Sequence, residues 1–107
     1  MKKYNISNFK DGWIIGNFEP SLLKTKNFEV AVLTHYKHQE WPKHYHKYLT
    51  EYNLLLEGRM IINDVEINQN EIFILEPKEV ADPIFLENCK ILCIKVPSII
   101  GDKYEVQ

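Results

Sequence analysis

Apolar and polar residues alternate over short runs in this chain, and turn-forming residues interrupt the runs about every ten positions. A helical period of apolar residues is hard to find. The pattern is typical of an all-β sandwich or barrel. The sequence predicts strands at Trp13–Phe18, Phe28–His38, Tyr45–Lys47, Glu51–Glu57, Arg59–Asn63, Glu71–Leu75, Pro83–Leu86 and Lys90–Val96.

Two of the predicted strands differ in how their faces are filled. In Phe28–His38 the even positions, from Phe28 to Tyr36, are more apolar than the odd positions, so we expect the even face to be buried. In Lys90–Val96 both faces are largely apolar. Because such a strand often packs its second face against a chain arm or a partner subunit, we expect a homodimer.

The length of 107 residues leaves room for one domain with a single modest core. We expect one domain over 1–107, with a core at about 28–96, an N-terminal arm at 1–11 and a C-terminal strap at 97–107. The net charge is -2 and its charges are spread along the chain, so nucleic acid is not an expected partner. No apolar run approaches the roughly 20 residues of a membrane span, so a membrane is not expected either.

The cysteines and the N-terminus bear on the cellular compartment. Cys89 and Cys93 lie in a predicted turn and strand, where an extended chain separates their Cα atoms by about 13 Å, too far for a disulfide. We expect buried free thiols that bind no metal, because a second pair of cysteines for a zinc site is missing. The basic start of the chain lacks the apolar segment of a signal peptide, and we expect a cytoplasmic protein.

Two of the four histidines, His44 and His46, are separated by one residue. In a strand they point to the same face, and a short loop after them can return Glu51 on a neighbouring strand. Two imidazoles and a carboxylate are the ligands of metal sites with open coordination positions. The alternative is that both histidines form ordinary hydrogen bonds on the surface or in the core.

The stretch from His44 to Gly58 resembles the first conserved motif of the cupins. The two histidines, Glu51 and Gly58 stand at the spacings of that motif. The motif's leading glycine is replaced by His38, a residue type that also adopts left-handed backbone conformations. The resemblance covers about residues 28–96 and implies a small double-stranded β-helix, or jelly roll, of RmlC-like type, with a metal ion inside its mouth.

The second cupin motif is much weaker in this chain. Pro77 matches it, whereas Glu71 and Glu79 replace its glycines and Asp82 replaces its metal-binding histidine. Asn70 can supply the turn expected at the first of these glycines. Asp82 is either a fourth ligand, with His44, His46 and Glu51, or a polar residue in a solvated turn before Pro83.

The resemblance implies two alternative functions. The first is a metal-dependent enzyme acting on a small polar metabolite, either a dioxygenase or a sugar isomerase or epimerase, with Fe, Mn, Zn or Ni as the divalent ion. Glu51 is then the candidate catalytic carboxylate. The second is a non-catalytic module that binds a sugar or another small metabolite, with metal absent or only structural. A purely structural role in dimerisation also remains open, and for His35, His38 and Trp41 packing is the default interpretation.

Overall fold

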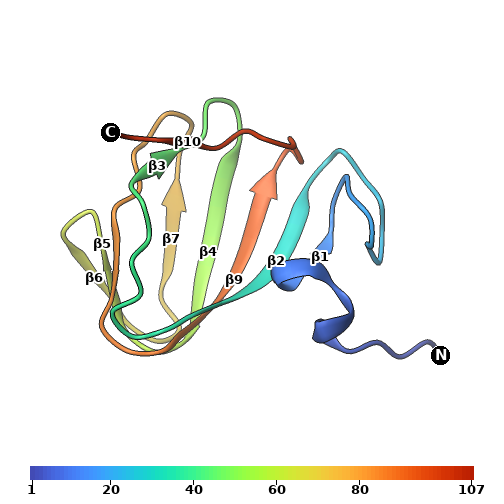
Figure 1. Cartoon of the computed structure of the whole chain (residues 1–107), viewed down its shortest axis with the longest axis horizontal. Coiled ribbons are helices and arrows are strands. Elements are labelled where there is room, and N and C mark those ends of the chain that lie inside the picture. Colours follow the sequence, from blue (N-terminus) through green and yellow to red (C-terminus); the bar gives the residue numbers. More distant parts are fainter.

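The computed structural model describes all residues 1–107 and contains short strands and two single-turn 3-10 helices (Figure 1). The helices are η1 (Ile6–Asn8) and η2 (Lys10–Gly12). The strands are β1 (Trp13–Ile15), β2 (Glu29–His35), β3 (His44–Tyr45), β4 (Thr50–Glu57), β5 (Met60–Ile62), β6 (Val65–Ile67), β7 (Ile72–Leu75), β8 (Pro83–Phe85), β9 (Cys89–Val96) and β10 (Tyr104–Glu105). No helix is long and apolar enough to cross a membrane.

The strands form two layers. One layer is a five-stranded antiparallel sheet in the order β1-β2-β9-β4-β7. The other contains the three-stranded sheet β6-β5-β8 and the pair β10-β3, and an isolated bridge joins His44 of β3 to Ala81 just before β8. The C-terminal segment runs across the end of the large sheet at which β9 ends (Figure 1).

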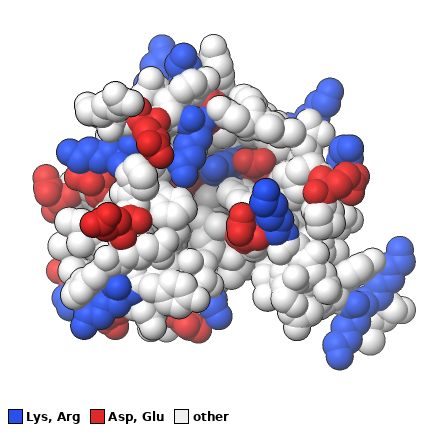
Figure 2. Space-filling view, in the orientation of Figure 1, with Lys and Arg blue, Asp and Glu red and all other residues white.

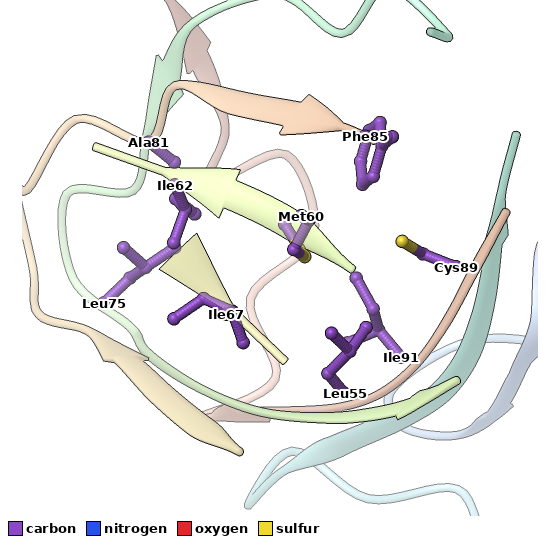
Figure 3. Packing of buried hydrophobic residues seen from close by; sticks show 9 residues of the cluster. All are labelled: Leu55, Met60, Ile62, Ile67, Leu75, Ala81, Phe85, Cys89 and Ile91. Carbon is purple, nitrogen blue, oxygen red and sulfur yellow. The ribbon is translucent and has the colours of Figure 1, made fainter. Parts of the chain in front are cut away.

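The hydrophobic core lies between β4 and β9 on one side and β5 and β8 on the other. Its side chains point toward one another from both layers (Figure 3). Nine buried residues form it: Leu55, Met60, Ile62, Ile67, Leu75, Ala81, Phe85, Cys89 and Ile91. Cys89 and Cys93 are buried and not disulfide-bonded, which confirms the prediction of free thiols.

The inner face of the large sheet changes from charged to apolar along its strands. The register of β2, β9 and β4 aligns three rows on this face: Glu29, Lys95 and Glu51; Ala31, Cys93 and Asn53; and Leu33, Ile91 and Leu55. The apolar row joins the core. The charged row lies at the end of the sheet that the C-terminal segment crosses.

The prediction for the buried face of the strand Phe28–His38 was wrong. In β2 the odd positions face inward: Ala31 and His35 are buried, whereas Thr34 is exposed. The inner face of this strand borders a partly polar cavity as well as the core, so its residues are less apolar than those outside. Hydropathy alone therefore assigns the wrong face.

Two short strands, β6 and β10, were not predicted. Each has two or three residues, too few for an alternating pattern to stand out. The turn chemistry was predicted better. His38 and Asn70 both adopt positive φ angles, 61° and 71°, as expected where they replace or adjoin glycine positions of the cupin motifs.

Candidate metal centre

His44, His46 and Glu51 come together at the charged end of the two layers. His44 is the first residue of β3, His46 follows that strand, and Glu51 is the second residue of β4. One potential ligand atom from each side chain lies within 4.8 Å of the others. All three residues are buried, with exposed fractions of 7%, 4% and 9%. The group has the size and the donor atoms to hold a metal ion.

Backbone carbonyls fix the orientation of both imidazoles. His44 Nδ1 lies 3.1 Å from the carbonyl oxygen of Pro42, and His46 Nδ1 is bonded to the carbonyl oxygen of Asp102. Because a carbonyl only accepts, each Nδ1 must carry the proton and donate it. When a ring in this orientation is neutral, it keeps a lone pair on Nε2, which is the arrangement found in histidine ligands of metals.

The contact between His46 and Glu51 also fits a cation. His46 Nε2 lies 3.0 Å from Glu51 Oε2, so both nitrogens of this buried ring face oxygen acceptors. A neutral imidazole has one N–H and can satisfy only one of them. Either the ring carries a second proton, or a cation lies between Nε2 and the carboxylate.

Electrostatics favour the protonation states of Glu51 and His44 that metal binding requires. Burial raises the pKa of Glu51, but the hydrogen bond with His46 and the charge of Lys95 outweigh it and lower the pKa to about 2. Burial lowers the pKa of His44. The hydrogen bond to the Pro42 carbonyl raises it, but the nearby charge of Lys103 lowers it again, and the net shift is downward. Glu51 is therefore ionised at neutral pH and the His44 imidazole is neutral.

Asp102 supports the centre and was not singled out in the sequence. Its carboxylate accepts hydrogen bonds from the backbone N–H groups of Lys47, Tyr48 and Leu49, at 2.9, 3.0 and 3.2 Å. These residues form the loop between His46 and β4. Since the carbonyl of the same Asp102 holds His46, one buried residue fixes both the loop and a ligand candidate. No local pattern marks an aspartate that acts across more than fifty residues of sequence.

The strand β10 extends this support along β3. Glu105 pairs with His44, and Tyr104 pairs with Tyr45. The two tyrosine rings stack at a centroid distance of 5.4 Å, and Lys47 Nζ lies 4.3 Å from the Tyr104 ring centroid. The C-terminal segment thus pairs with β3 along the edge opposite the one that bridges to Ala81.

The structure does not bring Asp82 together with the other three candidates. Its side chain is 47% exposed, and the nearest charged partner is Lys43, at 3.8 Å. Ala81, which pairs with His44, is the buried residue at this point and lines the cavity beside the centre. Because successive residues of an extended chain point to opposite faces, an inward Ala81 places Asp82 outward.

A cavity of about 690 Å³ opens beside the centre, and His44 and Glu51 are among its lining residues. His35 and Trp41 also line it. The His35 ring stacks on Phe85 at a centroid distance of 4.3 Å and meets the edge of Trp41 at 4.8 Å. The volume lies in the range of roughly 300–1,000 Å³ that is typical of small-molecule sites.

The sequence matches no protein-family model, and no curated protein is significantly similar to it. Solved structures do resemble it. An uncharacterized conserved protein with a double-stranded β-helix domain, from Klebsiella pneumoniae subsp. pneumoniae MGH 78578, is 16% identical with a TM-score of 0.71, over 98% of this chain and 91% of that protein. A cupin-2 domain containing protein from Shewanella frigidimarina NCIMB 400 is 18% identical with a TM-score of 0.57, over 67% of this chain and 72% of that one.

A bacterial pirin from Escherichia coli, solved in complex with nickel(II), is 11% identical with a TM-score of 0.66. The match covers 82% of this chain and 39% of the pirin, so this chain spans less than half of that protein. At these identities the likenesses show the fold. The chain has the cupin fold, and the prediction of an all-β double-stranded β-helix is confirmed.

Proposed function

We propose that this chain is a metal-dependent enzyme that acts on a small polar metabolite, with a divalent ion held by His44, His46 and Glu51. The observation that carries the proposal is the orientation of the two imidazoles. Backbone carbonyls accept from both Nδ1 atoms, and one nitrogen of each histidine lies within 4.8 Å of the Glu51 carboxylate in one buried group. The nickel(II) complex of the pirin with a similar fold supports a metal-dependent role.

Two nitrogens and one carboxylate oxygen leave coordination positions open for a substrate. This ligand set is compatible with Fe, Mn, Zn or Ni. When bound, the ion polarises a substrate oxygen or, in the case of iron, activates dioxygen. Glu51 would hold the ion, and a carboxylate bound to a metal is not free to act as a general base. The chain's part in the reaction is then to orient the substrate in the cavity and to exclude water.

The test of this function uses untagged protein that has been stripped of metal and reloaded with Fe(II) or Zn(II). Each form is assayed with a panel of small polar metabolites for oxygen consumption and for sugar isomerisation. Turnover with oxygen uptake in the iron form alone identifies a dioxygenase, whereas turnover in the zinc form identifies an isomerase or epimerase. Turnover that is unchanged in His44→Ala contradicts the proposal.

One observation favours the alternative of a non-catalytic binding module. In the segment of the second motif, the buried residue that pairs with His44 is Ala81, whose side chain cannot bind a metal. A module of this kind predicts that His44→Ala leaves the binding of a sugar or other metabolite largely intact. Equilibrium dialysis of the variant against the wild type separates the two functions.

We also propose that the protein is a homodimer, with the outer face of the large sheet as its interface. The register places two apolar rows on this face: Val32, Leu92, Leu54 and Ile72, and Val30, Ile94, Tyr52 and Ile74. Tyr52, Ile72 and Ile74 are 43%, 67% and 47% exposed. An antiparallel sheet normally carries polar residues on a solvated face, so rows of this kind support burial against a second copy.

Ile74→Lys is expected to convert the dimer to a monomer, because it places a charge within the proposed interface. Size-exclusion chromatography with light scattering at micromolar concentrations measures the change. Ile84→Lys is the matched control, since Ile84 is 48% exposed but lies in β8 of the other layer, and it is expected to remain dimeric. A monomeric wild type contradicts the proposal.

A further inference from the structure

We propose that the cavity beside the candidate metal centre binds a small carboxylate with a flat apolar body, and that Lys95, Lys103 and Asn53 bind its carboxylate group. The identification of this molecule as the substrate rests on the proposed function. The binding itself depends only on residues of the cavity that are not ligand candidates.

Two ammonium groups line the cavity close enough to Glu51 to interact with its charge, but neither forms an ion pair with it. Lys95 and Lys103 are both lining residues, and neither takes part in an ion pair. Lys95 Nζ lies 4.8 Å from the ring centroid of Trp13, and Lys103 Nζ lies 4.6 Å from that of Trp41. The indole rings therefore hold both ammonium groups at defined positions, where a bound anion can pair with them.

The two positive charges are close enough to oppose each other. Burial lowers the pKa of Lys103, and the charge of Lys95 lowers it further. Two positive and two negative side chains line the cavity: Lys95, Lys103, Glu51 and Asp11. Their charges sum to zero, so a bound divalent ion would give the cavity a net positive charge. Figure 2 shows a hollow near the centre of this face, with both basic and acidic side chains around it. An anionic ligand would relieve the repulsion.

Asn53 adds a buried donor that the fold does not use. It is 3% exposed, lines the cavity, and its Nδ2 atom has no hydrogen-bond partner. It lies one row from Glu51 on the inner face, and its amide interacts with that carboxylate and helps to lower the pKa of Glu51 without meeting the geometry of a hydrogen bond. A buried amide nitrogen without a partner costs free energy, which a ligand oxygen can recover.

A second part of the cavity, which begins at Trp41 beside Lys103, fits a flat apolar group. His35, Trp41 and Phe85 form an aromatic wall, in which the His35 and Phe85 rings are 10° from parallel. Leu33 and Ile91 of the apolar row also line this space. Because the inner face changes from charged to apolar along the strands, a bound carboxylate would point its head group toward the metal centre.

The donors favour a carboxylate over a phosphate. The lining residues include no arginine. The only lining glycine is Gly12, and the 3-10 helix that contains it is a single turn. Phosphate sites commonly use arginine forks, glycine-rich loops or the first turn of a long helix. Two ammonium groups and one amide match the two oxygens of a carboxylate.

The experiment titrates the protein with benzoate and with benzamide, its neutral analogue, and follows binding by NMR. Zinc-loaded and metal-free samples are both titrated, and their metal content is measured. We expect benzoate to bind at least about 10-fold more tightly than benzamide in both samples, since one charge-assisted hydrogen bond is worth about that factor. Lys95→Met and Lys103→Met should each weaken benzoate about 10-fold and leave benzamide unchanged.

Lys90→Met is the matched control. Lys90 lies in the same strand as Lys95 but on the opposite face, and it does not line the cavity. This variant should bind benzoate as the wild type does. Equal affinity for benzoate and benzamide, phosphate that binds as tightly as benzoate, or an unaltered Lys95→Met variant would overturn the inference. Absence of metal in the loaded sample contradicts the proposed function, whereas the benzoate titration of the metal-free sample still decides the inference.

Discussion

Replacing His46 with alanine is expected to weaken binding of a divalent ion by at least about 100-fold. The substitution removes one of three ligand candidates, and loss even of a residue that supports a ligand typically costs 10- to 100-fold in affinity. It also leaves Glu51 without its hydrogen-bond partner at 3.0 Å. Competition between the protein and a chelator for Zn(II) measures the change, and circular dichroism confirms that the variant is folded.

Asp82→Ala is the matched control for this experiment. Asp82 replaces the ligand of the second cupin motif in the sequence, but its carboxylate is half-exposed and faces Lys43. We expect its Zn(II) affinity to equal that of the wild type. If Asp82→Ala weakens zinc binding as much as His46→Ala does, Asp82 belongs to the ligand set and the three-residue centre is incomplete.

Replacing Asp102 with alanine is expected to lower the free energy of unfolding by about 3 kcal/mol. The carboxylate accepts three backbone N–H groups, and hydrogen bonds to a charged group each contribute about 1.5–3 kcal/mol, with partial replacement by water. Leu49 is almost fully buried, so water reaches its N–H least. Urea unfolding measures the change, and Asp82→Ala should lie within about 0.5 kcal/mol of the wild type.

The effect of Asp102 should disappear in acid. Burial raises the pKa of Asp102, but the bonds from Lys47, Tyr48 and Leu49 outweigh it, so the pKa lies below the ordinary value. A group whose pKa falls on folding stabilises the protein above its unfolded pKa, and the stabilisation is lost as the pH falls through the folded pKa. Wild type and Asp102→Ala should therefore differ fully at pH 7 and converge at low pH. A pH-independent difference would contradict this role.

Asp102→Ala should also weaken zinc binding, by about 10- to 100-fold, although the residue is not a ligand candidate. The carbonyl that accepts from His46 Nδ1 belongs to Asp102, and the lost carboxylate contacts free both this segment and the loop before β4. Normal zinc affinity in a destabilised variant would contradict this role, because His46 would then keep its orientation without the Asp102 carboxylate.

The spacing of the histidines, Glu51 and Gly58, which matches the first cupin motif, predicted the group at 44, 46 and 51. Local geometry explains this, because residues two apart in a strand share a face and a short loop returns the next strand beside it. Asp82 illustrates the limit of such spacing. A shift of one residue along an extended chain reverses the face, and Ala81 points inward in its place.

Residues that act across long sequence separations were not found from the sequence. Asp102 contacts the loop after His46, and Lys103 and Trp41 meet beside the cavity, yet no local pattern connects these positions. The inward face of β2 was missed for a different reason. Glu29, Ala31 and His35 line a partly polar interior, so the more apolar residues of this strand lie outside. Sites of this kind violate the hydrophobic pattern that predicts the fold.

The metal site formed by His44, His46 and Glu51 is tested most directly by X-ray diffraction. Crystals of untagged protein are grown with Zn(II), and data are recorded above and below the zinc absorption edge. We predict one strong anomalous peak about 2.0–2.2 Å from the Nε2 atoms of His44 and His46 and from a carboxylate oxygen of Glu51. Their Nδ1 atoms should remain bonded to the carbonyls of Pro42 and Asp102. Side chains at 44, 46 and 51 without a peak between them, or a zinc ion bound elsewhere, would contradict the metal centre.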